Sequence, residues 1–164
     1  MQKVVKEAEI LRGDKQDIAA QSISNSFDLK PTSKTNELAL SFDLSKTTAQ
    51  DFGLVLSNSK GEKVLIGYEK STNRFYVDRT EGGKKNFEKG FSGRHYAPRL
   101  AESNMLKMNI HIDVASVELF ADDGATVMTD VFFPNEDFNQ IAIFSKEGMA
   151  YLEQGTLWRI KSAW

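Results

Sequence analysis

Residues 106–124, which read LKMNIHIDVASVELFADDG, carry the pattern that decides the fold class of this chain. Apolar and polar residues alternate over 106–112 and again over 117–121, and a period of two is typical of strands with one buried face. The Asp-Gly pair at 123–124 tolerates the positive φ angles of a tight hairpin turn, and a third alternating run follows over 127–133. This region therefore predicts three consecutive antiparallel strands.

The same alternation recurs along most of the chain. It covers residues 38–44, 64–69, 140–146 and 157–161, and Asn58-Ser59-Lys60-Gly61 supplies a turn between two of the runs. Such runs, about nine to eleven in number, have the spacing of strands in an antiparallel sandwich or barrel. We therefore predict an all-β fold, an antiparallel two-sheet β-sandwich of the jelly-roll or concanavalin-like type.

Two segments depart from this pattern, and a third predicts a turn. Residues 1–21 mix charges with a weakly amphipathic run, which favours a short helix or an extended arm, so we divide the chain into an arm over 1–21 and a sandwich domain over 22–164. Residues 80–104 contain four glycines and a proline, which predicts a long irregular loop. Lys146-Glu147-Gly148 predicts the turn of a final hairpin.

Composition narrows the possible functions. The chain has 164 residues, the length of one ordinary domain, and a net charge of −2 with both signs interspersed. This balance gives no general attraction to nucleic acid or to an anionic membrane, and no stretch has the ~20 apolar residues of a membrane span. The absence of cysteine excludes disulfides and a cysteine nucleophile. We therefore expect no nucleic-acid or membrane partner.

Motifs of enzymatic and metal chemistry are weak. Asp51-Phe52-Gly53 matches the metal-binding tripeptide of kinases, but the sequence has neither the glycine-rich loop nor the catalytic loop of a kinase. His95 and His111 are the only histidines, too few for the usual ligand set of a zinc site. No Gly-x-Ser-x-Gly nucleophile elbow occurs either. We therefore predict no metal site, no cofactor and no catalytic residue in this chain.

Acidic residues leave one alternative open, because glycosidases use a pair of carboxylates. The candidates in or beside predicted strands are Asp78, Asp113, Glu118 and Asp123. We favour structural ion pairs of these carboxylates with Arg79, Arg94 or Arg99, since charge-assisted bonds of this kind hold strands and loops in place.

Aromatic residues leave a second alternative, a surface that binds carbohydrate. On such a surface an aromatic ring stacks on the sugar while carboxylates and arginines hydrogen-bond its hydroxyls, although aromatic side chains are also ordinary core residues. The candidate carbohydrate-binding residues are Tyr76, Asp78, Arg79, Arg94, Asp113, Glu118 and Trp158.

Five segments, in order along the chain, resemble one protein family. They are residues 5–12, Phe75-Tyr76-Val77-Asp78-Arg79, residues 110–124, residues 128–134 and residues 157–164. Together they are similar to the C-terminal domain of the β-fructosidases (levanases, inulinases and invertases) of glycoside hydrolase family 32. The sequence departs from that pattern at Ala115, Asp122 and Asp130, which we expect to lie at the surface rather than in the core.

The resemblance implies a β-sandwich that performs no catalysis alone, because the catalytic acids of family 32 lie in an N-terminal five-bladed propeller. The motifs that carry them, W-M-N-D-P-N, R-D-P and E-C, are absent from this sequence. We therefore expect a non-catalytic accessory domain of a fructan- or sucrose-hydrolysing glycosidase, which stabilises the propeller and the oligomer. The alternative is a fructan-binding carbohydrate-binding module.

The resemblance also implies partners and a location. The arm over 1–21 corresponds to the linker from the propeller, and its apolar residues Val4, Val5, Ile10 and Leu11 are candidates for the interface with that domain. Fructan and a second copy of the chain are further expected partners. The parent enzyme is expected to be exported, as a secreted, periplasmic or cell-surface protein, because polymeric fructans are met outside the cytoplasm.

Overall fold

The computed structural model describes residues 9–31 and 33–161, which form strands connected by turns and loops. This confirms the predicted all-β class, and the eleven strands of the described residues fall within the predicted number. The strands are β1 (Arg12–Ile18), β2 (Gln21–Leu29), β3 (Asn36–Asp43), β4 (Asp51–Ser57), β5 (Lys63–Glu69), β6 (Arg74–Glu81), β7 (Arg94–Pro98), β8 (Met105–Ile112), β9 (Ser116–Ala121), β10 (Thr126–Val131) and β11 (Gln140–Ile160), with a short 3-10 turn, η1, at Asp122–Gly124.

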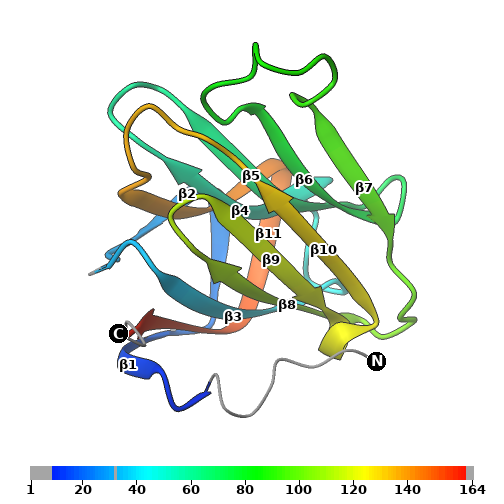
Figure 1. Cartoon of the computed structure of the whole chain (residues 1–164). Coiled ribbons are helices and arrows are strands. Elements are labelled where there is room, and N and C mark those ends of the chain that lie inside the picture. Colours follow the sequence, from blue (N-terminus) through cyan, green and yellow to red (C-terminus); the bar gives the residue numbers. More distant parts are fainter. Residues whose placement is uncertain (1–8, 32, 162–164) are drawn as a thin grey trace.

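Strand β11 joins the two layers of the sandwich (Figure 1). Its residues 140–146 pair with β4, and its residues 152–159 pair with β3. The hydrogen-bonded order is β10-β9-β8-β3-β11-β4-β5-β6-β7, and β1 and β2 also pair with β11. Layer 1 therefore holds β10, β9, β8, β3, the second half of β11 and β1. Layer 2 holds β7, β6, β5, β4, the first half of β11 and β2.

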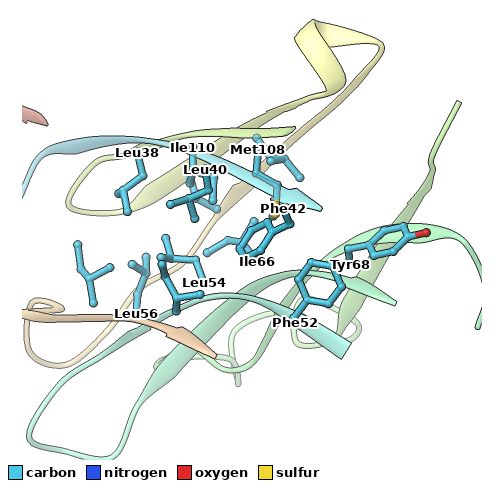
Figure 2. Packing of buried hydrophobic residues seen from close by; sticks show 14 of the residues in the cluster. Leu38, Leu40, Phe42, Phe52, Leu54, Leu56, Ile66, Tyr68, Met108 and Ile110 are labelled. Carbon is cyan, nitrogen blue, oxygen red and sulfur yellow. The ribbon is translucent and has the colours of Figure 1, made fainter. Parts of the chain in front are cut away.

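The core lies between the two layers. Figure 2 shows Leu38, Leu40 and Phe42 of β3 facing Phe52, Leu54 and Leu56 of β4, and all six side chains are buried. Alternation places these side chains on the inward face of each strand. The period-two runs at 38–44, 64–69 and 106–112 therefore identified the core correctly.

The predicted final hairpin is wrong. Residues 145–148 form an irregularity inside β11, where the register with β2 shifts between Phe144 and Met149. Glu147 and Gly148 have positive φ angles of 54° and 136°. Positive φ suits a bulge as well as a turn, and here it lets one strand pass from layer 2 to layer 1. By contrast, the turn predicted at 122–124 is confirmed, because η1 joins the antiparallel strands β9 and β10.

The predicted irregular segment 80–104 contains a strand, β7, which pairs with β6 at the edge of layer 2. Its residues are exposed or half-buried without a strict alternation, so a search for period two misses it. The rest of the β6–β7 connection is a loop, as predicted.

The N-terminal region extends the sheet. Strand β1 pairs with the second half of β11, and Ile18 at its end is buried. Residues 12–18 of the predicted arm thus lie within layer 1, while the role of 1–21 as a linker stays a prediction. No helix among residues 9–31 and 33–161 is both long and apolar enough to cross a bilayer.

Candidate functional site

The outward face of layer 2 carries a hollow of about 450 Å³. Its floor contains the apolar side chains of Val55, Leu65 and Phe144, from β4, β5 and β11. Charged residues from β6 and β7, among them Asp78 and Arg94, form part of its rim. Because Arg94, Asp78, Leu65 and Val55 are successive partners across the sheet, four different strands place them side by side.

Tyr76 lies beneath this face rather than on it. Its strand position points outward, yet its exposed fraction is 0%. The ring crosses Gly67, where an added Cβ would come within 2.5 Å of Cζ of Tyr76. Its hydroxyl donates to Oδ1 of Asp51 at 2.5 Å, and the Arg94 guanidinium covers the ring at 4.0 Å from its centroid. Tyr76 therefore supports the floor and is covered on one face by Arg94.

The environment of Tyr76 keeps its hydroxyl neutral. Burial, and then the hydrogen bond to the Asp51 carboxylate, raise the pKa of Tyr76 above that of a free tyrosine. The hydroxyl is therefore a fixed donor to Asp51 across the physiological pH range.

Asp78 and Arg94 form a fixed ion pair at the rim. Arg94 Nε donates to Oδ2 of Asp78 at 2.9 Å, and the backbone N–H of Thr80 donates to Oδ1 at 3.0 Å. Burial favours the neutral acid, but the hydrogen bonds from Thr80 and Arg94 outweigh it and lower the pKa of Asp78. The pair confirms the favoured structural ion pairing for this carboxylate.

Arg79 points to the opposite side of β6, toward the edge of the sandwich. Its Nη1 donates to the carbonyl of Val131 at 2.8 Å and lies 3.4 Å from Oδ1 of Asp130. Its guanidinium also stacks over Phe91 at 4.0 Å. Since successive strand residues face opposite sides, Asp78 and Arg79 do not share one pocket.

The remaining candidate sugar-binding residues belong to layer 1. The register places Glu118, His111, Glu37 and Trp158 next to one another across its outward face. Asp113 is exposed in the β8–β9 turn, where it accepts the backbone N–H of Val114 at 2.7 Å. The predicted set is thus split between opposite faces, and only Tyr76, Asp78 and Arg94 come together.

The outward face of layer 1 holds a buried carboxylate, Glu37, which the sequence patterns did not indicate. Arg12 holds it through two hydrogen bonds, Nε to Oε2 and Nη2 to Oε1, both at 2.7 Å. Asn109 donates to Oε1 at 3.1 Å, and the Arg12 guanidinium stacks over Trp158 at 4.4 Å. Despite its burial, these hydrogen bonds lower the pKa of Glu37. Alternation marks Glu37 as outward, but no local signal indicates that Arg12 covers it.

Two departures from the family pattern are buried, which corrects the expectation that they lie at the surface. Asp122 is 8% exposed and Asp130 is 5% exposed. Asp122 accepts from Nε of Arg99 at 2.8 Å, and Asp130 lies 2.8 Å from Nδ1 of His95. Each aspartate has an ionic or hydrogen-bonding partner that offsets the cost of its burial. Arg79 and Arg99 therefore pair with carboxylates that the sequence had not indicated.

The candidates for a domain interface are only partly described. Val4 and Val5 lie outside the described residues. Ile10 is 78% exposed, and Leu11 is half-buried with its carbonyl accepting the backbone N–H of Lys161 at 2.9 Å. In residues 9–31 and 33–161, no group of three or more histidine, aspartate or glutamate side chains could hold a metal ion.

Comparison with known proteins agrees with this architecture. The chain is 26% identical to a levanase of Bacillus subtilis, over 100% of this chain and 25% of the relative. It is 29% identical to a sucrose-6-phosphate hydrolase of Escherichia coli, over 98% of this chain and 31% of the relative. The structure of an exo-inulinase from Aspergillus awamori superposes with a TM-score of 0.81 and 26% identity, covering 93% of this chain and 30% of that one.

The chain thus spans about a quarter to a third of the length of these relatives. The sequence model of the family described as "Glycosyl hydrolases family 32 C terminal" matches residues 7–159, nearly the whole chain. This chain therefore belongs to the C-terminal domain family of the family 32 glycosyl hydrolases.

Proposed function

We propose that this chain is a non-catalytic accessory domain, which packs against the catalytic part of a fructan- or sucrose-hydrolysing enzyme and stabilises it. Its relatives are a levanase and a sucrose-6-phosphate hydrolase that are three to four times longer, and it belongs to the C-terminal part of that family. The chain lacks the three acidic motifs that the family resemblance assigns to the propeller. Hydrolysis by the domain alone is therefore not expected.

The observation that carries this proposal is the way Arg12 is held on layer 1. The bidentate bond to Glu37 and the stack on Trp158 fix the chain where it enters the sandwich. Glu9 and Arg12 line a hollow of about 330 Å³ on the same face, together with Phe120 and Asn109. These contacts place Glu9 and Arg12 on the outward face of layer 1, which is the face that we assign to the catalytic part.

The test joins this chain to the catalytic domain of a family 32 levanase and compares thermal inactivation with the catalytic domain alone. The fusion is expected to raise Tm, because a packed interface stabilises both parts. A fusion carrying Ile10→Glu and Leu11→Glu should fold but lose most of that gain. The matched control carries Ser24→Glu and Ser26→Glu at exposed positions of β2 in layer 2. Equal Tm values for the fusion and the catalytic domain alone would refute the stabilising role.

A separate assay tests the non-catalytic character. Release of fructose from sucrose, inulin or levan by the pure 164-residue chain would refute it.

Location and assembly follow from the same proposal. One relative from Aspergillus awamori is named an extracellular exo-inulinase, which supports an exported parent enzyme. A homo-oligomer is proposed on the family resemblance, and light scattering of the fusion measures its mass directly.

A further inference from the structure

We propose that the hollow on the outward face of layer 2 binds a neutral saccharide. The proposal goes beyond the accessory role and does not depend on it. It retains Asp78 and Arg94 from the residues that the sequence singled out. It adds Lys63, Thr80, Glu81 and Lys146 at the rim.

The charges of the rim favour a neutral ligand over an anion. Each cation has a carboxylate within reach: Lys63 Nζ lies 2.7 Å from Glu81, Arg94 Nε lies 2.9 Å from Asp78, and Lys146 Nζ lies 3.5 Å from Asp51. An anionic ligand would have to displace these carboxylates. A neutral polyol can leave these ion pairs in place, because its hydroxyls accept hydrogen bonds from the cations and donate hydrogen bonds to the carboxylates at the same time.

The floor supplies the apolar surface that a sugar ring requires. Val55 and Leu65 are half-buried and Phe144 is buried, all on the outward side of layer 2. Sites for small ligands combine such a floor with a few fixed polar groups in a volume of about 300–1,000 Å³. The hollow of about 450 Å³ falls in that range.

The polar groups at one side of the hollow are held in place before any ligand arrives. Arg94 lies between the Tyr76 ring and the Asp78 carboxylate, and Tyr76 is itself fixed by Asp51. Little side-chain freedom remains to be lost at these residues on binding, which lowers the entropic cost of association.

The corresponding face of layer 1 fits a saccharide less well. The chain segment that contains Glu9 and Arg12 lines its hollow, and the Trp158 ring is covered by Arg12. Layer 2 has its outward face on the other side of the sandwich. A sugar bound there would not compete with a polypeptide that enters along layer 1.

The experiment titrates the 164-residue chain with levan-type and inulin-type oligosaccharides, xylo-oligosaccharides, fructose and fructose 6-phosphate, followed by amide chemical shifts in NMR. Millimolar binding of a neutral saccharide is expected, with shifts concentrated at Leu65, Asp78 and Arg94. Comparison of the fructose and xylose series identifies the sugar class. Tighter binding of fructose 6-phosphate than of fructose would overturn the neutral-ligand assignment.

Two variants locate the site. Val55→Trp fills the floor, and Lys63→Ala removes an exposed rim cation without touching the core. Both are expected to abolish or weaken binding, while Val127→Trp, at an outward position of β10 in layer 1, leaves it unchanged. Absence of shifts with every saccharide, or binding that both site variants retain, would overturn the proposal. Neither result bears on the accessory role, which the thermal inactivation of the fusion tests separately.

Discussion

Glu37 shows how one long side chain, that of Arg12, can bury a residue that faces away from the core. Its position on β3 faces away from the core, yet its exposed fraction is 1%. Arg12 reaches it from β1 and supplies two charge-assisted hydrogen bonds. A buried carboxylate of this kind is tolerated because its charge is paired and its lone pairs are used.

His111 lies beside the Arg12–Glu37 ion pair, but no hydrogen bond from the described part of the chain offsets the burial of its Nε2. Its Nε2 is 3.8 Å from Oε1 of Glu37, too far for a hydrogen bond, and it has no hydrogen-bond partner among the described residues. Burial lowers the pKa of His111, and the positive charge of Arg12 acts in the same direction. The negative charges of Glu37 and Glu118 oppose this effect without cancelling it. The folded protein therefore binds a proton at this site less readily than the unfolded chain does.

We predict that His111 makes the fold less stable in mild acid. Its pKa is lower in the folded state than the ordinary ~6.5, so the free energy of unfolding is highest above that value and falls as pH drops toward the folded pKa. His111→Gln should flatten this slope between about pH 7 and pH 5. Urea unfolding in a His95→Gln background, where His111 is the remaining histidine, measures the effect. The same slope with and without His111 would contradict it.

Strands β5 and β6 fit together because one residue of β5, Gly67, has no side chain. Gly67 on β5 leaves the space over which the Tyr76 ring of β6 crosses toward Asp51. The partner positions Gly67 and Tyr76 face each other in the register. A glycine inside a strand often marks such a close approach.

We predict that Gly67→Ala destabilises the fold by about 2 kcal/mol, because the new methyl group forces Tyr76 out of its position. Chemical denaturation measures the loss. In a Tyr76→Ala background the same substitution should cost much less, since the clashing ring is gone, and a double-mutant cycle yields the coupling between the two positions. Additive effects of the two substitutions would contradict this origin.

Several elements were predictable because their physical cause is local. Strands β3, β8 and β9 alternate, since one face of each packs in the core and the other does not. Strand β7 has no such contrast, and the residues at 146–148 have the same preferences in a bulge as in a hairpin turn. Period and turn chemistry therefore do not distinguish a continuous β11 from two strands.

The candidate site was predictable only in part for a related reason. Tyr76 and Asp78 lie on one face of one strand, which alternation reveals. Val55 and Phe144 join them through the order of strands in layer 2, and that order depends on long-range pairing. Arg79 was grouped with Asp78 among the candidate sugar-binding residues, but the side chains of these two neighbours contact different parts of the sandwich.

Strand β11 belongs to both layers of the sandwich. Its first half pairs with β4 and β2, and its second half pairs with β3 and β1. The edges at the far ends are also connected: Arg79 donates from β6 to the carbonyl of Val131 on β10, and Thr126 donates to the carbonyl of Pro98 at 2.7 Å. The two layers therefore cannot separate without breaking contacts that hold both of them in place.

We therefore predict that the two layers unfold together. Leu54→Ala removes a fully buried side chain from layer 2, and such a change typically costs about 2–5 kcal/mol. If unfolding is one cooperative step, slowly exchanging amides of β8 in layer 1 should lose as much protection as those of β5 in layer 2. Native-state hydrogen exchange by NMR measures both sets, with the exposed substitution Thr129→Ala as the matched control. A loss of protection confined to β5 and its neighbours would contradict the prediction. It would mean that the two layers unfold separately although β11 runs through both of them.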